Sequence, residues 1–458
     1  MKSTLATIQA AVSASTMTMD ASFDGVSTDS RHVAAGNLFV ALRGDRFDAH
    51  EFLHQVAERK IAAVIVEKIP ADLNVPALVV TDTRIALGQI AHYWRQQFTL
   101  PLIGVTGSNG KTTVKEMIAA ILEVACGTDQ YLATRGNFNN DIGVPLTLLR
   151  LNTACKAAVI ELGMNHPGEI SVLSAIAQPT VGLVNNAQRE HQEFMESVEA
   201  VARENGAVFA HLPADGIAVF PADEPYTDLW REYAGLRKTL TFGLSDDADV
   251  RCTYKANDFG SELSVVTGFS GRQKFEINLA AAGAHNVRNA LAAIACTLAI
   301  GIAQDAIVRG LETFAPVNGR LQRKVATNNA LIIDDTYNAN PDSVRAAIDV
   351  LAQAAAPRIL VLGDMGEVGN DGRQYHEEVG DYAHANGIEH VLTLGELASY
   401  TASAFGAGAH HYENLESLNV ALAAIVHAHA TVLVKGSRFM KMERVVQHLV
   451  NQQIQEAH

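Results

Sequence analysis

A short stretch around two glycines, residues 102–113, carries the clearest chemical signal in the sequence. The apolar residues that end at Val105 are typical of a buried strand, and the amphipathic pattern from Val114 onward is typical of a helix. Glycines allow backbone N–H groups to turn toward a ligand, and the N-terminus of a helix attracts anions. A lysine and a hydroxyl at this point would contact terminal phosphates and Mg²⁺. The stretch therefore predicts a site for a nucleoside triphosphate. Its residues are Thr106, Gly107, Ser108, Asn109, Gly110, Lys111, Thr112 and Thr113.

The stretch departs from the general P-loop pattern at one position. That pattern has a glycine five residues before Gly110, where this chain has Val105, and Gly104 lies one step earlier. An ordinary glycine turn would also explain isolated glycines. The Gly-Lys-Thr-Thr run between a strand and a helix nevertheless favours a phosphate site.

Other polar side chains follow predicted strands. Glu161 ends the apolar run 157–160, and His191 lies beyond the end of the run 181–184. The carboxyl ends of parallel strands form the ligand-binding edge of such a sheet, and a carboxylate near a P-loop is an expected Mg²⁺ ligand. A lone histidine is more commonly a surface or capping residue, so both interpretations of His191 stay open at this point.

Three polar segments could bind further ligands. Residues 27–31 and 43–50 mix hydroxyls, carboxylates, arginine and glycine beside predicted strands. Solvated loops and helix caps would have the same composition, so ligand binding is one of two interpretations. The segment 134–145 is rich in asparagine, whose amide supplies donors and acceptors together, and this favours binding.

The composition limits the class of protein. At 458 residues the chain suggests about three domains, and 48% hydrophobic residues allow substantial cores. The net charge of -15 argues against a nucleic-acid partner. The four cysteines are scattered, which favours free thiols in a reducing compartment. The start of the chain shows no signal-peptide pattern, and the longest apolar run, residues 290–303, is too short to span a bilayer. We therefore expect a cytoplasmic protein without membrane insertion.

The pattern of elements predicts an α/β protein of three domains, at residues 1–82, 83–314 and 315–458. Short strands and helices alternate in the first domain, and the second has a parallel sheet followed by an antiparallel hairpin over 262–277. The third alternates strands and helices again, as in a second nucleotide-binding type of sheet. The predicted strands are 38–42, 62–66, 77–80, 102–105, 157–160, 181–184, 331–334, 358–362, 390–394 and 431–434, and helices are predicted over 83–97, 343–355, 376–385 and 439–450.

These segments, in their order, resemble the Mur ligases of peptidoglycan synthesis along essentially the full chain, and the P-loop of that family also lacks the additional glycine. The matching segments are residues 27–31, 38–42, 106–113, 136–145, 159–163, 285–290, 334–341 and 434–438. Residues 334–341 and 139–145 are most similar to the family member that adds D-alanyl-D-alanine to a UDP-N-acetylmuramoyl-tripeptide. The resemblance implies an N-terminal UDP-binding domain, a central ATPase-type domain and a Rossmann-like C-terminal domain. It also implies an ATP- and Mg²⁺-dependent amide ligase that acts through an acyl phosphate, and we expect a monomer.

The resemblance also implies roles for single residues. Lys111, Glu161, His191 and Arg320 match catalytic positions, and Thr112, Glu161 and His191 match metal positions. Asn286 and Asn289 match adenine contacts, and Arg320 and Asp335 match contacts to the nucleotide phosphate and ribose. For the substrates it implies Thr28, Asp29, Ser30 and Arg31 around the UDP portion, Asn137, Asn139, Asn140 and Asp141 around the sugar-linked portion, and Asn338, Asn340 and Lys435 around the dipeptide.

One position departs from the family. Asn205 stands where the family usually has a lysine that is carbamylated by CO₂. An amide carries no negative charge to hold a second Mg²⁺, so we expect activity that is independent of bicarbonate. Glu190 and Glu193, beside His191, are candidates to compensate.

Two other functions are compatible with the chemistry. Folylpolyglutamate synthetase relatives share the ATP chemistry but lack an N-terminal domain of this type. A nucleotide-regulated binding protein without turnover is disfavoured because Lys111, Thr112 and Glu161 are all present.

Overall fold

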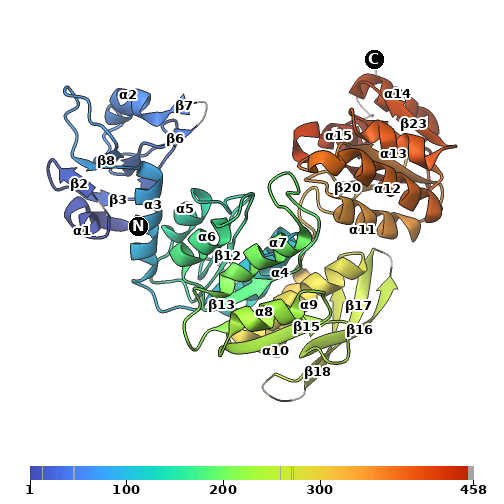
Figure 1. Ribbon diagram of the computed structural model, residues 1–458, viewed down its shortest axis with the longest axis horizontal. Coiled ribbons are helices and arrows are strands. Elements are labelled where there is room, and N and C mark those ends of the chain that lie inside the picture. Colours follow the sequence, from blue (N-terminus) through green and yellow to red (C-terminus); the bar gives the residue numbers. More distant parts are fainter. Residues whose placement is uncertain (13, 45–46, 258, 270, 272, 452–458) are drawn as a thin grey trace.

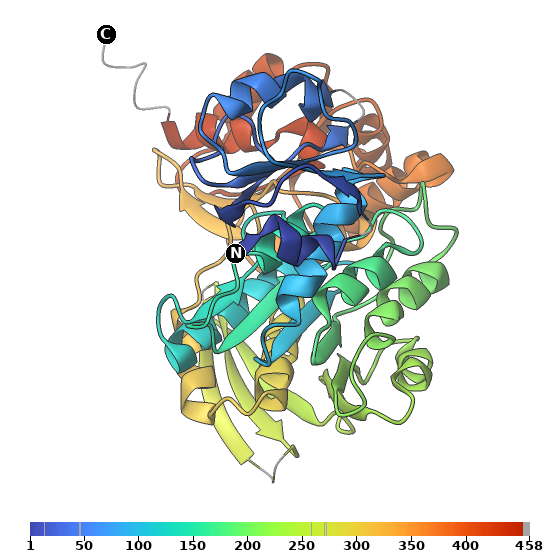
Figure 2. The same cartoon turned by 90° about the vertical axis from the view of Figure 1, so that its left-hand side faces the viewer.

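The computed structural model describes residues 1–451 except 13, 45–46, 258, 270 and 272. Three β-sheets with flanking helices form three lobes, and the N-terminal and C-terminal lobes both rise from the same side of the central lobe (Figures 1 and 2). This arrangement confirms the predicted α/β class with three successive sheets. The exact domain boundaries stay a prediction.

The N-terminal lobe contains a five-stranded sheet in the order β2-β9-β8-β5-β4. All pairs are parallel except that of β2 with β9. One face of the sheet packs on α2, and the other packs on α1 and α3. The elements are β1 (Lys2–Thr4), α1 (Leu5–Gln9), β2 (Ala14–Met17), β3 (Ser22–Asp24), β4 (Val26–Ser27), β5 (Leu38–Val40), β6 (Arg43–Gly44), β7 (Phe47–Asp48), η1 (Ala49–Phe52), α2 (Leu53–Ala57), β8 (Ala63–Val66), β9 (Ala77–Val80) and α3 (Thr83–Arg95).

The central lobe contains a nine-stranded sheet in the order β11-β12-β10-β13-β14-β15-β16-β17-β18. The P-loop strand β10 lies in its parallel part, and β16, β17 and β18 form the antiparallel end. The strands are β10 (Leu102–Thr106), β11 (Tyr131–Ala133), β12 (Ala157–Glu161), β13 (Val181–Val184), β14 (Ile217–Pro221), β15 (Lys238–Gly243), β16 (Val250–Asn257), β17 (Gly260–Thr267) and β18 (Gln273–Leu279).

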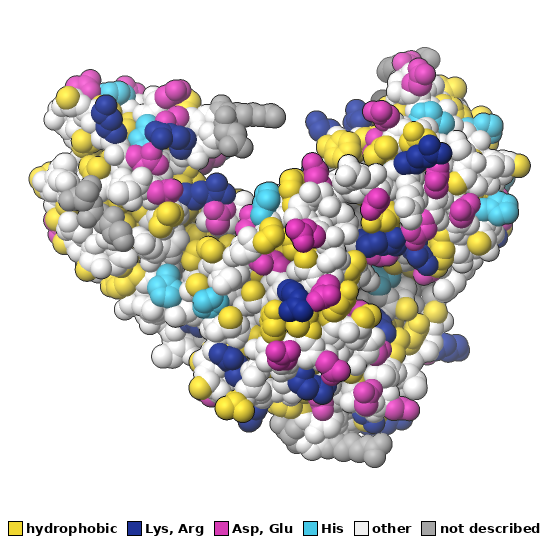
Figure 3. Space-filling model, in the orientation of Figure 1, with side chains coloured by type: hydrophobic (Ala, Val, Ile, Leu, Met, Phe, Trp, Pro, Cys, Tyr) yellow, Lys and Arg dark blue, Asp and Glu magenta, His cyan; other side chains and the backbone are white. Residues whose placement is uncertain are grey.

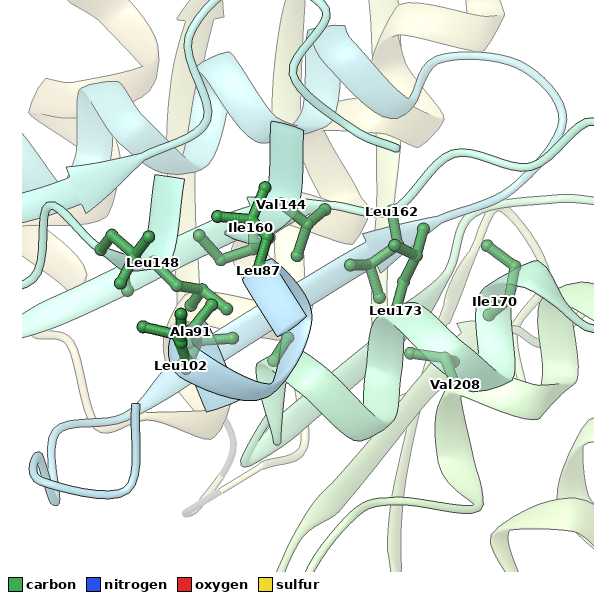
Figure 4. Close-up of a cluster of buried hydrophobic side chains, with 14 of the residues drawn as sticks. Leu87, Ala91, Leu102, Val144, Leu148, Ile160, Leu162, Ile170, Leu173 and Val208 are labelled. Carbon is green, nitrogen blue, oxygen red and sulfur yellow. The ribbon is translucent and has the colours of Figure 1, made fainter. Parts of the chain in front are cut away.

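Helices cover both faces of the central sheet, and for this reason its middle strands are apolar on both faces. Ile103 and Val105 belong to one core cluster with residues of α4, α9 and α10, whereas Leu102 belongs to another with residues of α3 and α5. Figure 4 shows the part of this cluster around Leu87, Ala91 and Leu102, where α3 packs against the central lobe. The same cluster includes buried residues of the N-terminal lobe, such as Leu38 and Ile65. The helices are α4 (Lys111–Cys126), α5 (Gly143–Leu148), α6 (Glu169–Ala177), α7 (Val198–Gly206), η2 (Ala207–Phe209), α8 (Thr227–Ala234), α9 (Ala284–Ala299) and α10 (Gln304–Thr313).

The C-terminal lobe contains a six-stranded sheet in the order β19-β20-β24-β21-β22-β23, with only β19 antiparallel to its neighbour. Helices α11 and α12 cover one face, and α14 and α15 cover the other. The elements are β19 (Gln322–Val325), β20 (Leu331–Asp335), α11 (Pro341–Ala352), β21 (Arg358–Gly363), η3 (Gly369–Asp371), α12 (Gly372–Ala385), β22 (His390–Leu394), α13 (Ala398–Phe405), β23 (Ala409–Tyr412), α14 (Leu415–Ile425), β24 (Thr431–Lys435), η4 (Arg438–Met440) and α15 (Glu443–Asn451).

Most predicted elements are confirmed, and the differences lie at their ends. The strand predicted over 38–42 ends at Val40, and the helix predicted over 439–450 begins only at Glu443, after a short 3-10 turn. Pro341 starts α11 two residues before the predicted Ser343, because proline is well suited to the first turn of a helix. The antiparallel strand β16 was not predicted.

Two expectations about environment can be compared with the structure. Within the described part of the chain, no helix is both long and apolar enough to cross a membrane. All four cysteines are free thiols, and burial raises the pKa of Cys252 to about 11.

Candidate active site

A cavity of about 1160 Å³ lies where the central and C-terminal lobes meet, and its lining residues run from Arg84 to Phe439. Figure 3 shows the surface hollowed above the central lobe, between the two outer lobes. The carboxyl ends of β10, β12 and β13 open toward this cavity, as expected for a parallel sheet.

The P-loop folds as the sequence predicts. Strand β10 ends at Thr106, and α4 begins at Lys111 with Gly110 as its N-cap residue. Gly110 has φ +82°, and a side chain there would overlap the amide of Asn289. Glycine is therefore required at this turn by both conformation and space.

The ammonium group of Lys111 folds back over the loop. Its Nζ donates to the carbonyl oxygens of Gly107 at 2.5 Å and Ser108 at 3.0 Å, and to Oε2 of Glu190 at 3.2 Å. The side chain is 15% exposed, so the positive charge is partly shielded from water. A cation in this place suits the terminal phosphates of a nucleotide.

Glu161 lies at the centre of a polar cluster. Its Oε1 accepts hydrogen bonds from the Thr112 hydroxyl at 3.1 Å and from the Asn139 amide at 2.9 Å. Arg320, from the C-terminal lobe, donates to the same Thr112 oxygen at 2.9 Å. The other oxygen of Glu161 is buried and has no hydrogen-bond partner among the described residues.

This cluster fits a magnesium ion that is bound together with a nucleotide. Among the described residues there is no group of three or more His, Cys, Asp or Glu side chains that could hold a metal by itself. Mg²⁺, however, commonly takes only one or two protein oxygens and completes its shell with phosphates and water. The unpaired oxygen of Glu161 and the hydroxyl oxygen of Thr112 are protein oxygens that could serve as the Mg²⁺ ligands.

His191 lies on the cavity, but its ring contacts carboxylates. Its Nδ1 lies 2.5 Å from Oε2 of Glu367, and its Nε2 lies 3.7 Å from Oε2 of Glu190. The contact with His191 holds the pKa of Glu367 below its usual range. The role of His191 as a metal ligand stays a prediction.

A chain of buried amides joins the P-loop to α9. Asn185 donates to Oδ1 of Asn289 at 2.9 Å, Asn289 donates to Asn286 at 3.1 Å, and Asn286 donates to the carbonyl of Ala282 at 2.8 Å. These bonds fix the positions of Asn286 and Asn289 at the edge of the cavity. The family resemblance implies that the adenine of the nucleotide binds there.

The C-terminal lobe contributes a second polar group. Lys435 donates to Oδ2 of Asp335 at 2.6 Å and to the carbonyl of Asn338 at 2.8 Å. The Asn340 amide donates across the lobes to Asn109 at 2.9 Å. Lys435 therefore both joins two segments within this lobe and lines the cavity.

The structure brings most of the predicted site residues to this one cavity. Those on its wall are Ser108, Asn109, Gly110, Lys111, Thr112, Thr113, Asn137, Asn139, Asn140, Asp141, Glu161, His191, Asn286, Asn289, Arg320, Asp335, Asn338, Asn340 and Lys435. Thr106 and Gly107 are not on the wall. Thr106 is buried, and Gly107 acts through its carbonyl on Lys111.

Thr28, Asp29, Ser30 and Arg31 lie elsewhere, in the N-terminal lobe after β4. Asp29 accepts hydrogen bonds from the backbone and side chain of Arg31 and contacts His32. These contacts hold the pKa of the Asp29 carboxyl well below its usual range. The segment does not line the cavity, and its contact with the UDP portion stays a prediction.

Asn205 is buried beneath the P-loop. Its Oδ1 accepts a hydrogen bond from the Thr106 hydroxyl at 2.7 Å, and it does not line the cavity. Of the two candidates to compensate for the family lysine, Glu190 is buried beside Lys111, whereas Glu193 is exposed and lies off the cavity.

Sequence reasoning missed several lining residues. Arg84 is paired with Asp141, Arg288 donates to Asp223 at 2.6 Å, and the ring of Tyr337 lies 4.2 Å from the Arg320 guanidinium. Arg288 lies within the segment 285–290 and Tyr337 within the segment 334–341, so their positions in these motifs could have predicted them as site residues. No sequence pattern around Arg84 indicated that it would line the cavity.

The fold and the cavity together define a P-loop nucleotide-binding α/β enzyme whose site is assembled from two lobes. Residues 105–297 match the Mur ligase middle domain, and residues 319–438 match the Mur ligase glutamate ligase domain. The UDP-N-acetylmuramoyl-tripeptide–D-alanyl-D-alanine ligase of Escherichia coli K12 is 41% identical over 434 residues, which are 94% of each chain. The chain belongs to the Mur ligase family.

Solved structures agree with this assignment. A MurF from Acinetobacter baumannii superposes with a TM-score of 0.91 at 35% identity, over 98% of this chain and 99% of that one. The MurF ligase from Thermotoga maritima, solved with ADP, has a TM-score of 0.84 at 26% identity, over 94% of this chain and 98% of that one.

Proposed function

We propose that this protein joins D-alanyl-D-alanine to a UDP-N-acetylmuramoyl-tripeptide at the expense of ATP. The observation that carries the proposal is the single cavity in which the P-loop, Glu161 and Arg320 of the other lobe meet around Thr112. The names of full-length relatives support the choice of substrates. The product is an amide, and the by-products are ADP and phosphate.

The residues of the chain address the main electrostatic difficulty of this reaction. A substrate carboxylate must attack the γ-phosphate, so two anions must approach each other. Lys111 of the central lobe and Arg320 of the C-terminal lobe supply two positive charges on the wall of the cavity. Charges fixed in a partly dry site act more strongly than they would in water.

Mg²⁺ belongs to this proposal. Thr112 and Glu161 would hold it, with His191 as a further candidate. When bound, the ion neutralises charge on the phosphates. Asn139, which donates to Glu161, would orient the carboxylate.

The same cavity explains how the acyl phosphate could be kept from water. Asn109 bonds to Asn340 and Thr112 bonds to Arg320, so the C-terminal lobe rests directly on the P-loop. A lobe in this position excludes solvent from the reacting atoms. The amine of D-alanyl-D-alanine would then displace phosphate, with Asn338, Asn340 and Lys435 around it.

We place the UDP portion at residues 28–31 and the sugar-linked portion at residues 137–141.

Since one chain supplies every group of the cavity, we propose an active monomer. The requirement for ATP and the four free thiols are consistent with a cytoplasmic location.

Mass spectrometry of the product tests the proposal. The enzyme is given ATP, Mg²⁺, UDP-N-acetylmuramoyl-tripeptide and D-alanyl-D-alanine, and the expected product is the UDP-linked pentapeptide. A folate substrate serves as the matched control and should give no glutamylated product. Phosphate release only with folate would refute the proposal in favour of a folylpolyglutamate synthetase, and no ADP with any cell-wall precursor would favour a binding protein.

A further inference from the structure

Arg189 connects the central lobe to the C-terminal lobe. It lies in the loop after β13, and its guanidinium group faces two carboxylates of the other lobe. Nη2 donates to Oδ1 of Asp342 at 2.6 Å, and Nη1 donates to Oε2 of Glu378 at 2.7 Å. The backbone N–H of Arg189 also donates to Asp342 at 2.9 Å. Arg189 thus contacts both the first turn of α11 and the middle of α12.

This ion-pair group is stronger than an ordinary surface pair. The side chains of Arg189, Asp342 and Glu378 are 20%, 22% and 31% exposed. Partly buried, multiply bonded arginine–carboxylate pairs are screened less than exposed single pairs. Glu378 and Asp342 together hold the pKa of Arg189 above its usual value, so the group stays charged.

The next two residues in the chain belong to the candidate active site. Glu190 contacts the ammonium group of Lys111, and His191 contacts Glu367 of the C-terminal lobe. His191 has φ +50° and Glu367 has φ +59°, which is the left-handed region that residues with a side chain disfavour. A strained backbone of this kind persists only where surrounding contacts hold it.

Arg189 itself does not line the cavity. Other contacts between these lobes include Asn109 to Asn340, Arg320 to Thr112 and His191 to Glu367, which use residues of the candidate site. The backbone N–H of Glu193 also donates to the carbonyl of Glu367 at 3.2 Å. Arg189 is therefore a lobe-to-lobe contact that can be altered without removing a group that faces the ligand.

We propose that Arg189 is a positioning residue, which docks the C-terminal lobe against the segment 189–191. Docking places Glu190 beside Lys111 and His191 beside Glu367. The loss of this contact separates the lobes in part of the molecules, and those molecules lack Arg320 at the P-loop.

The test compares Arg189→Gln with Arg203→Gln. Arg203 also pairs with a carboxylate, Glu199, but both lie on the same helix α7. Arg189→Gln is expected to lower kcat about tenfold, equivalent to about 1.4 kcal/mol, and to enlarge the radius of gyration in small-angle X-ray scattering. Arg203→Gln is expected to change neither, and Arg189→Lys should recover part of kcat.

Salt and a second variant provide independent readouts. Raising the salt concentration should lower kcat of the wild type more than that of Arg189→Gln, since the ion pairs are already lost in the variant. Glu378→Gln probes the same contact from the other lobe and decides the question if Arg189→Gln does not fold. The double variant should be no slower than Arg189→Gln within about twofold, because coupled residues are not additive.

The kinetic readout rests on the proposed function, whereas the scattering readout does not. An inactive wild type would refute the proposed function, but the scattering comparison of wild type and variants would still test whether Arg189 holds the lobes together. The positioning role is overturned if both Arg189→Gln and Glu378→Gln keep the wild-type scattering curve. It is also overturned if kcat falls equally in Arg203→Gln, or if the two substitutions lower kcat additively.

Discussion

Replacement of Glu161 by glutamine separates the function of this residue from its contribution to stability. The carboxylate is 2% exposed and forms no ion pair with a described residue, because Arg320 reaches the Thr112 hydroxyl instead. In Glu161→Gln, the amide oxygen can keep both bonds that Oε1 accepts now, from Thr112 and Asn139. The amide nitrogen then takes the place of Oε2, which has no partner. The substitution therefore removes a charge and little else.

The substitution should raise the stability of the protein and lower its activity. The effective cost of burying an unpaired ion is several kcal/mol, and an unpaired amide N–H costs about 1–3 kcal/mol. We expect the variant to be more stable without ligands by about 1 kcal/mol, which corresponds to a rise in Tm of about 1 °C for a chain of 458 residues. Activity should fall at least about 100-fold, or about 2.7 kcal/mol in the barrier, since the anionic oxygen toward the nucleotide is lost.

Glu389→Gln is the matched control. Glu389 accepts two hydrogen bonds from the Arg358 guanidinium, at 2.8 and 3.1 Å, and lies outside the cavity. This variant should lose up to about 1 kcal/mol of stability and keep full activity. Phosphate release with all substrates measures activity, and thermal unfolding without nucleotide measures stability. An active Glu161→Gln, or one less stable than wild type by more than about 1 kcal/mol, would refute the reasoning.

Three further predictions follow from the structure. Lys111→Ala should lower ADP formation at least about 100-fold, and peptide-bond synthesis at full speed would remove the basis of the P-loop assignment. Activity should not depend on bicarbonate, because Asn205 is a neutral amide buried against Thr106; a reproducible gain when bicarbonate is returned to CO₂-stripped enzyme would contradict this. The backbone N–H of His50 helps to lower the pKa of Asp48 from 3.8 to about 2, so the unfolded state binds the proton more tightly and stability rises with pH across this interval. Urea unfolding should therefore show a difference between wild type and Asp48→Asn that is full above pH 4 and is lost toward pH 2; a difference that stays constant down to pH 2 would refute the prediction.

The sequence by itself determined the local parts of this protein. The P-loop could be recognised because phosphate binding uses consecutive backbone N–H groups, so strand, glycines, lysine and helix stand in one short run. The apolar runs gave most strands, because strands buried on both faces have few polar residues. Glu161 could be placed because it directly follows such a strand.

Only the tertiary structure decided which distant groups meet. Arg320 reaches Thr112 across 208 residues, and Arg189 pairs with Asp342 across 153. Nothing in the local pattern of Arg189 distinguishes it from a solvated arginine, since its partners are fixed by how two separately folded lobes dock. Asn205 shows the same limit, because its place in the sequence predicted the loss of a charge but not that its side chain turns away from the cavity to Thr106. Local sequence encodes what adjacent backbone groups can do, whereas long-range pairing depends on the packing of whole lobes.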